Sequence, residues 1–313
     1  MKKILFMFLL PLSALQLSAQ EESMTTSSEL VLQVSSLPEA KLGYTFSFRF
    51  PVLQGESDLT KDNNLKLHLT AEITPVSLNG IFKAVLTPIA FLEFSAGARA
   101  GAGWNINLFG SDIYGNGLNM YNESDSISYI DGKPFDALLW KAWLGGTFQF
   151  DLAAIIPGEW NHVVFLTYHE INYHANTRAA AGEAWYFEAD DGENFNTFNY
   201  YGNIVLGYQM PIFLNMVAFM AEMDYAIHKH ISECNDIGLD LMRWKFSNIL
   251  NFIITEKLSI ALITQLRTRR NFTNFDEHTS EKPFLHFTKR ILDTSDPVRL
   301  EFYRIAAIVS YKF

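Results

Sequence analysis

Three segments of the chain each carry two charged residues that are separated by a single residue. These are Glu222 and Asp224, Arg243 and Lys245, and Arg267 and Arg269. Because every second side chain of an extended chain points to the same face, the two members of each pair would share a face. Two carboxylates gathered with four cations would form ion pairs, and the remaining positive charge would attract anions.

The segment His169–His174 (HEINYH) contains residue types that bind zinc. A metalloprotease helix carries two histidines four residues apart, which places both on one side of the helix. Here the two histidines are five residues apart, and on a strand they would point to opposite faces. We therefore interpret this segment as a strand near a loop and not as a metal site.

Two further groups could ligate a metal by residue type alone. His228, His230 and Cys234 offer nitrogen and sulfur ligands, but they straddle the end of a predicted strand and a loop, which favours a solvated loop. The acidic tract Glu188–Asn194 (EADDGEN) lacks the spacing of a calcium-binding loop. We interpret it as a solvated loop as well.

Gly97, Gly101 and Gly103 share a face with Arg99, and they do not form a phosphate-binding loop between a strand and a helix. We expect these glycines to let the sheet bend or to make room for side chains. Residue spacing marks out no catalytic constellation. We therefore predict that the protein is not an enzyme, and we predict neither a metal nor a cofactor.

Strands are the elements that must position the charged residues. Apolar residues alternate with polar ones from about residue 29 to the end of the chain, a period that a helix does not satisfy. Twelve strands are predicted, and ten or fourteen would also fit the less regular N-terminal third. They are Glu29–Ser36, Leu42–Val52, Asn64–Pro75, Gly80–Thr87, Phe91–Asn105, Phe135–Leu152, Asn161–His174, Thr197–Met210, Val217–His228, Met242–Ile254, Lys257–Arg269 and Val298–Phe313.

Strand and loop lengths favour a membrane barrel over a soluble β-sandwich, in which apolar and polar residues also alternate. Most of the predicted strands exceed the usual length of about 5–6 residues. Short connections such as 212–214 and 255–257 take turns with long ones at 106–134, 175–196 and 271–297, as in outer-membrane barrels. We predict an all-β, antiparallel transmembrane β-barrel with up-and-down connections.

Composition excludes several other classes of protein. The chain has 313 residues and a formal charge of −10, with 49% hydrophobic and 14% aromatic residues, which excludes a disordered chain. The acidic balance argues against a nucleic-acid partner. A single cysteine excludes a disulfide framework and a multi-cysteine zinc site.

The first twenty residues have the pattern of a bacterial secretory signal peptide. Lys2 and Lys3 precede the apolar run Ile4–Leu10, and Ser18-Ala19-Gln20 resembles a cleavage zone. We predict two parts of the chain, a signal peptide over residues 1–20 and a barrel over residues 21–313.

The chain ends on a strand-like pattern in which Ala307, Val309, Tyr311 and Phe313 share a face. This ending resembles the C-terminal signal of bacterial outer-membrane β-barrel proteins, and the stretch Thr87–Ile106 is similar to barrels of spirochaetes such as the treponemes. The first resemblance implies an outer-membrane location, lipids and the barrel-assembly machinery as partners, and Tyr311 and Phe313 as the insertion signal. The loop lengths together with this ending predict both termini on the periplasmic side.

A tight turn at Thr255–Lys257 predicts how the charged residues pair. If Ile254 faces Leu258, Arg243 lies opposite Arg269 and Lys245 lies opposite Arg267. Like charges directly opposite each other are destabilising, so Glu222 and Asp224 on the preceding strand are expected to compensate them. Such a group is either a salt-bridge ladder that closes the lumen or an anion-attracting patch.

Two functional hypotheses follow. The protein is a narrow porin-like channel for small solutes, or it is a closed barrel that acts through its outer loops. A barrel of about eight strands has an interior filled by side chains, and one of about sixteen strands encloses a water-filled channel. A barrel of twelve strands lies between these two cases. The inward residues Trp143, Tyr201, Ile249 and Ile263 are expected to narrow it further.

Overall fold

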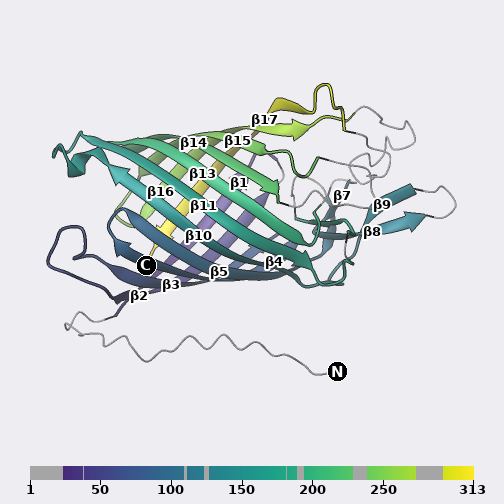
Figure 1. Cartoon of the computed structure of the whole chain (residues 1–313), viewed down its shortest axis with the longest axis horizontal. Coiled ribbons are helices and arrows are strands. Elements are labelled where there is room, and N and C mark those ends of the chain that lie inside the picture. Colours follow the sequence, from purple (N-terminus) through teal and green to yellow (C-terminus); the bar gives the residue numbers. More distant parts are fainter. Residues whose placement is uncertain are drawn as a thin grey trace.

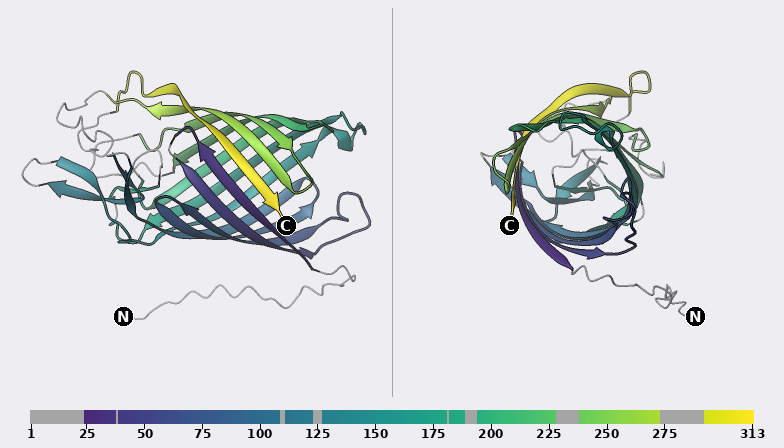
Figure 2. Two further views of the ribbon diagram at one scale, coloured as in Figure 1. Left: turned by 180° about the vertical axis from the view of Figure 1, so that it is seen from behind. Right: turned by 90° about the vertical axis from the view of Figure 1, so that its left-hand side faces the viewer.

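The computed structural model describes residues 24–37, 39–108, 111–122, 127–180, 182–188, 194–227, 238–272 and 292–313. In this part of the chain twelve antiparallel strands close into a barrel, because the last strand pairs with the first (Figures 1 and 2). The barrel strands are β1 (Thr25–Ser35), β2 (Ala40–Pro51), β3 (Asn64–Thr74), β4 (Ser77–Ile89), β5 (Leu92–Gly103), β10 (Leu139–Asp151), β11 (His162–Asn176), β13 (Thr197–Gln209), β14 (Leu214–Ala226), β15 (Arg243–Ile253), β16 (Leu258–Arg270) and β17 (Val298–Lys312).

Each predicted strand overlaps one barrel strand, so the predicted fold class and strand number are confirmed. The two largest differences at strand starts are four residues each: β1 begins at Thr25 and not at Glu29, and β10 begins at Leu139 and not at Phe135. Phe135 has a φ of 55°, a left-handed backbone conformation that a strand residue does not adopt.

Four short strands that the sequence did not indicate occupy the predicted loop 106–134, the first of them beginning one residue before it. β6 (Asn105–Leu108) pairs with β7 (Ser111–Tyr114), and β8 (Asn116–Asn122) pairs with β9 (Ile127–Gly132). A fifth short strand, β12 (Trp185–Phe187), comes from the connection after β11 and pairs with β8. Residues from two distant connections therefore meet at one end of the barrel (Figure 1).

The two ends of the barrel differ in their connections. At one end, here called the loop end, lie the short links 36–39 and 75–76 and the longer connections 104–138, 177–196, 227–242 and 271–297. At the other, here called the turn end, lie 52–63, 90–91, 152–161, 210–213 and 254–257, together with the start of β1 and the C-terminal Phe313. The alternation of connection lengths is therefore present from β5 onward.

The outer face of the barrel is apolar and exposed. On β10 the side chains of Trp140, Leu144 and Phe148 point outward, and Leu144 is 70% exposed. The alternate residues Lys141 and Thr147 line the inside. An apolar outer face of this extent suits hydrocarbon and not water, so the strands form a membrane-spanning wall. No helix in the described part of the chain is long and apolar enough to cross a membrane.

Two bands of aromatic side chains circle part of this outer face. Trp140, Tyr173 and Phe198 are in contact near the loop end, with ring centroids 5.4 and 4.9 Å apart, and Phe91, Phe148 and Phe165 are in contact near the turn end, at 5.9 and 6.4 Å. On β11 the bands are separated by the eight residues from Phe165 to Tyr173. This step is about 27 Å along the strand and, for a tilt of about 40°, about 20 Å along the barrel axis. This spacing fits the apolar band of a membrane barrel.

We predict that an arginine is tolerated inside the barrel but not on its outer face. Leu144→Arg places a charge in the hydrocarbon and should lower the free energy of unfolding by about 2–4 kcal/mol. The matched variant Thr147→Arg, three residues along β10, should cost clearly less because its side chain enters a polar lumen. Urea unfolding in lipid vesicles measures both. An equal cost for the two variants would contradict the assignment of the faces.

Candidate functional site in the barrel lumen

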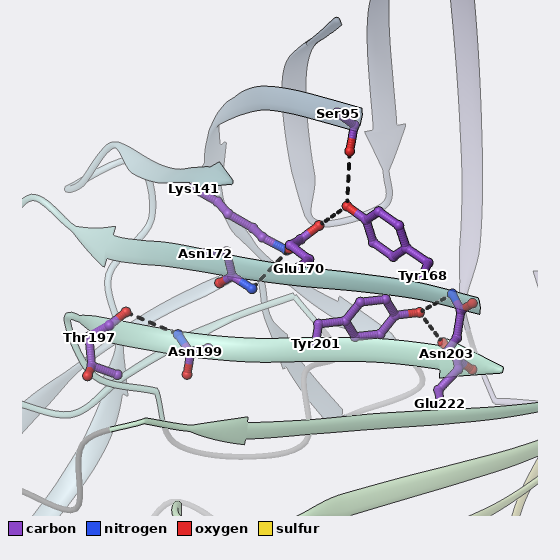
Figure 3. Close-up of polar contacts among 10 residues, drawn as sticks. All are labelled: Ser95, Lys141, Tyr168, Glu170, Asn172, Thr197, Asn199, Tyr201, Asn203 and Glu222. Atoms are coloured by element: carbon purple, nitrogen blue, oxygen red, sulfur yellow. Dashed lines mark hydrogen bonds and ion pairs between the residues drawn. The ribbon is translucent and has the colours of Figure 1, made fainter. Parts of the chain in front are cut away.

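The strand register brings the six charged residues of the sequence pattern to one side of the lumen. Glu222 lies opposite Lys245, Asp224 opposite Arg243, and Lys245 opposite Arg267. Arg243 Nε donates to Asp224 Oδ2 at 2.8 Å. The hydroxyl of Tyr201 donates to Glu222 at 2.9 Å (Figure 3). We call this group the β14–β16 charge cluster.

Glu301 on β17 joins this cluster, although the sequence pattern did not indicate it. Arg267 Nε donates to its carboxylate at 2.9 Å, and the guanidinium nitrogens of Arg269 and Arg299 lie 3.9 and 3.7 Å from it. With Glu301 and Arg299 included, three carboxylates face five cations among the described residues. The excess of two positive charges therefore stays as the sequence predicts.

A β-bulge on β17 explains why Glu301 was missed. Leu266 pairs with Phe302 while the adjacent Gln265 pairs with Arg304, so Tyr303 is the residue inserted between two consecutive register pairs. Such a bulge changes which side chains point inward. Along β17 the side chains that point inward are therefore those of odd-numbered residues up to Glu301 and of even-numbered residues from Arg304 onward. The regular alternation of inward and outward side chains is interrupted between them.

The bulge places the ring of Tyr303 among cations of the lumen. The guanidinium carbons of Arg267 and Arg304 lie 4.2 and 4.9 Å from its ring centre, and Lys245 Nζ lies 5.7 Å away. Cations over an aromatic face are attracted by the negative face of the ring. Arg304 also forms an ion pair with Glu39 and donates to Gln265 at 2.6 Å, which links β16 and β17 to the connection between β1 and β2.

A second polar network is centred on Glu170 of β11 (Figure 3). Lys141 Nζ lies 2.6 Å from Glu170 Oε1, the Tyr168 hydroxyl donates to Oε2 at 2.6 Å, and Asn172 donates to Oε1 at 3.0 Å. Glu170 is only 7% exposed. A carboxylate so deeply buried needs this full set of donors, because an unpaired buried charge is costly.

The loop end of the lumen holds the end of β12. The carboxylate of Glu188 accepts from Ser77 Oγ and from Asn79 Nδ2 on β4, each at 2.7 Å. The Arg99 guanidinium lies 5.2 Å from the centre of the Phe187 ring. The interpretation of Glu188 as part of a solvated loop is therefore wrong, because this residue reaches back to the barrel wall. Residues 189–193 of the acidic tract lie outside the described residues.

Two cavities lie inside the barrel, and Arg99 lines both. The cavity nearer the loop end has a volume of about 310 Å³ and is lined by Phe187, Glu188, Tyr303 and Arg304, among others. The second has a volume of about 430 Å³ and is lined by Lys83, Lys141, Trp143 and Tyr168, among others. As expected for residues that narrow the bore, Trp143 and Tyr201 point inward, and Ile249 pairs with Ile263.

The glycines of β5 leave room for lumen side chains. Trp143 lies directly opposite Gly97, and a side chain at Gly97 would meet the Trp143 ring. A side chain at Gly101 would meet Asn79, and one at Gly103 would meet the backbone of Gly115. The expectation that these glycines make room is confirmed.

The histidines of the HEINYH segment lie on opposite faces of β11, as expected. His169 bonds through Nδ1 to the hydroxyl of Tyr200 at 2.6 Å, and His174 packs edge-on against Trp185 at 5.1 Å. Within the described residues, no three His, Cys, Asp or Glu side chains are arranged to hold a metal ion. His228, His230 and Cys234 lie outside them.

The C-terminal aromatic residues lie at the turn end. The rings of Tyr311 and Phe313 contact edge to face at 4.9 Å, and the backbone N–H of Phe313 donates to Ser28 O at 3.0 Å. Phe313 is 63% exposed. Its side chain is accessible at the outside of the barrel, where an insertion signal would be recognised, and that role stays a prediction.

Solved structures of bacterial outer-membrane proteins align with nearly the whole chain, at low TM-scores. The fold resembles that of bacterial outer-membrane β-barrels. Omp33 of Acinetobacter baumannii is 10% identical with a TM-score of 0.35, covering 92% of this chain and 98% of that one. The transport unit of the autotransporter AIDA-I of Escherichia coli is 12% identical with a TM-score of 0.34, covering 98% and 94%. OccK5 of Pseudomonas aeruginosa is 9% identical with a TM-score of 0.26, covering 93% and 97%.

No family model and no curated protein matches the chain.

We predict that the Glu170–Lys141 ion pair couples β10 to β11. Glu170→Gln should destabilise the barrel because Lys141 loses its carboxylate, and Lys141→Met in the same chain should recover part of the loss. The coupling energy from a double-mutant cycle should be about 1–3 kcal/mol. The exposed pair Asp58–Lys61 is the control and should show little coupling. Additive effects of the two lumen substitutions would contradict the prediction.

Proposed function

We propose that the protein is a narrow, anion-preferring passage for small solutes across the bacterial outer membrane. One observation carries this proposal: the lumen presents an excess of cations on two opposite walls, although the whole chain is acidic.

The first wall is the β14–β16 charge cluster. Its five cations exceed its three carboxylates when Arg299 and Glu301 of β17 are counted. The ion pairs fix the side chains in place without cancelling the positive charge. In a lumen with low-dielectric walls such a charge acts over a longer distance than in open water.

The second wall is formed by β4, β5 and β10. Lys83, Arg99 and Lys141 line the cavity of about 430 Å³ together with the carboxylates Glu93 and Glu170. Each of these carboxylates contacts a lysine, Glu93 contacting Lys66 from β3 at 3.5 Å. In the closed strand order β5 is six strands from β16 among the twelve. The two cationic walls therefore face each other across the lumen.

This arrangement supports a preference for anions. A small anion that enters from the loop end meets Arg304 and Arg99 in the first cavity and Lys83 and Lys141 in the second. Rings of one sign of charge set selectivity in pores by lowering the energy of the opposite ion. The inward aromatic residues limit the size of the solute.

We predict that Arg267→Ala with Arg269→Ala shifts the ion selectivity of the barrel toward cations. The double variant removes two positive charges but leaves Glu301 near Arg299, so the barrel should still fold. The reversal potential of single barrels in planar bilayers under a KCl gradient measures the shift.

Lys61→Ala with Lys257→Ala is the matched control, because it removes the same charge from exposed connections at the turn end. Its reversal potential should stay close to that of the unchanged protein. Unchanged selectivity in a conducting Arg267/Arg269 variant would overturn the role of the β14–β16 charge cluster.

A second candidate function is a closed barrel that acts through its outer loops. The Glu170 network and the inserted Phe187 and Glu188 fill part of the lumen, and this observation favours closure. The same bilayer recordings separate the two functions, because a closed barrel shows no conductance in any variant.

We further propose that both termini lie on the periplasmic side. The start of β1 and Phe313 share the turn end, and outer-membrane barrels keep short turns in the periplasm and long loops outside. In this orientation the apolar wall contacts outer-membrane lipids, and Tyr311 and Phe313 are offered to the barrel-assembly machinery.

We predict that a cysteine or peptide tag in the connection 271–297 is labelled on intact cells by a reagent that does not cross the membrane. The same tag in the turn 254–257 should be labelled only after the outer membrane is permeabilised. The two connections flank opposite ends of β16, so they form a matched pair. The reverse labelling pattern would show that the orientation is inverted.

A further inference from the structure

Two cations of the second wall have no carboxylate partner in the described part of the chain. Lys83 makes no ion pair there, and the contact of the Arg99 guanidinium is with the ring of Phe187 at 5.2 Å. The neighbouring cations Lys66 and Lys141 each contact a carboxylate. Arg99 and Lys83 therefore differ from Lys66 and Lys141 in that no carboxylate of the described residues lies within ion-pair distance of their charge.

The register places these two cations close together and next to a third. Arg99 lies directly opposite Lys141 of β10, and Lys83 lies opposite Gly97, two residues before Arg99. Diagonal neighbours of this kind have Cα atoms about 7–8 Å apart, within reach of long side chains. Glu170 compensates the charge of Lys141, and Glu93 also lines the cavity. Lys83 and Arg99 are the like charges left close together without an ion pair among the described residues, which is destabilising.

The three cations line one cavity, of about 430 Å³. This volume lies within the range of about 300–1,000 Å³ found for small-molecule sites. The Trp143 ring, held over Gly97, and the hydroxyl-bearing Thr147 and Tyr168 complete part of its lining. The cavity thus joins charge, an aromatic surface and neutral polar groups, as a site for a polar organic molecule does.

One residue that lines this cavity carries a buried acceptor atom. Asn203 of β13 lines the cavity, and its Oδ1 atom is buried without a hydrogen-bond partner among the described residues. Its Nδ2 donates to the Tyr201 hydroxyl at 3.5 Å (Figure 3). Because an unsatisfied buried acceptor is costly, a hydroxyl or amino donor on a bound molecule would stabilise the site.

We infer that this cavity binds a small organic dianion that also carries a hydroxyl or amino group. Lys83 and Arg99 hold the two acidic groups, and Asn203 Oδ1 accepts from the donor group. The inference names a binding site and its ligand class, so it goes beyond passage through the lumen and does not require that the solute leave on the other side.

Calorimetric titration of the full-length barrel in detergent tests this inference, with malate, succinate, inorganic phosphate and glycerol as probes. Malate should bind, and succinate, which lacks the hydroxyl, should bind about fivefold more weakly. Glycerol, which lacks charge, should not bind. Phosphate binding as tight as that of malate would replace the organic ligand class by a simple anion site.

The variants identify the residues that hold the ligand. Lys83→Gln and Arg99→Gln should each weaken malate binding by at least about tenfold, since each removes a charged contact. Asn203→Ala should remove the difference between malate and succinate. Lys61→Ala with Lys257→Ala, outside the cavity, should bind as the unchanged barrel does. Heat-modifiable migration in gels shows that each variant is folded.

The outcomes separate this site from the proposed passage. No malate binding to the unchanged folded barrel, or equal binding by the Lys83 and Arg99 variants, overturns the site whatever the conductance. Malate binding by a barrel that shows no conductance supports the site and overturns the passage instead. The titration of the unchanged barrel can contradict the inference by itself, so the test does not depend on the stability of the variants.

Discussion

In the hydrocarbon of a membrane each backbone N–H and C=O must find its partner within the protein, and the structure follows from this constraint. The twelve strands satisfy it by closing, with the register from Glu29–Lys312 to Ser35–Ala306 joining the first strand to the last. Closure in turn divides every strand into an outer and an inner face. The outer positions become large and apolar, and every charged group of a strand must go to the lumen or to a strand end.

The lumen therefore concentrates charges that would otherwise be spread over a surface, and their pairing is uneven. Glu170 is almost completely enclosed by Lys141, Tyr168 and Asn172, which stabilises one wall. The β14–β16 charge cluster is also held by ion pairs but keeps a positive excess. The ion pairs thus fix the positions of the lumen side chains, while the excess of positive charge sets the electrostatic potential of the lumen. The stability of the barrel depends on the ion pairs, and the proposed passage depends on the excess positive charge.

The fold could be predicted from sequence because the period of two recurs over long stretches of the barrel strands, although bulges interrupt it in places. The pairing of Lys245 with Arg267 could also be predicted, since a short turn fixes the register of β15 and β16. The inward direction of Glu301 could not be predicted, because the bulge at Tyr303 changes which residues of β17 point inward. The pairing of Arg99 with Lys141 could not either, since a connection of 35 residues separates their strands, and no local signal fixes that register.

The contact of Glu188 with β4 shows why the placement of residues in long connections could not be predicted from the sequence. It also shows that such residues contribute to the lumen. Its carboxylate is held by Ser77 and Asn79, two residues of a strand more than a hundred positions earlier. The same segment places Phe187 on Arg99, the cation that both cavities share. A barrel wall follows from backbone pairing alone, whereas the size and charge of its lumen depend on which loop residues fold back inside. Barrels with the same number of strands can therefore differ in what they admit, because these contacts are set by individual side chains.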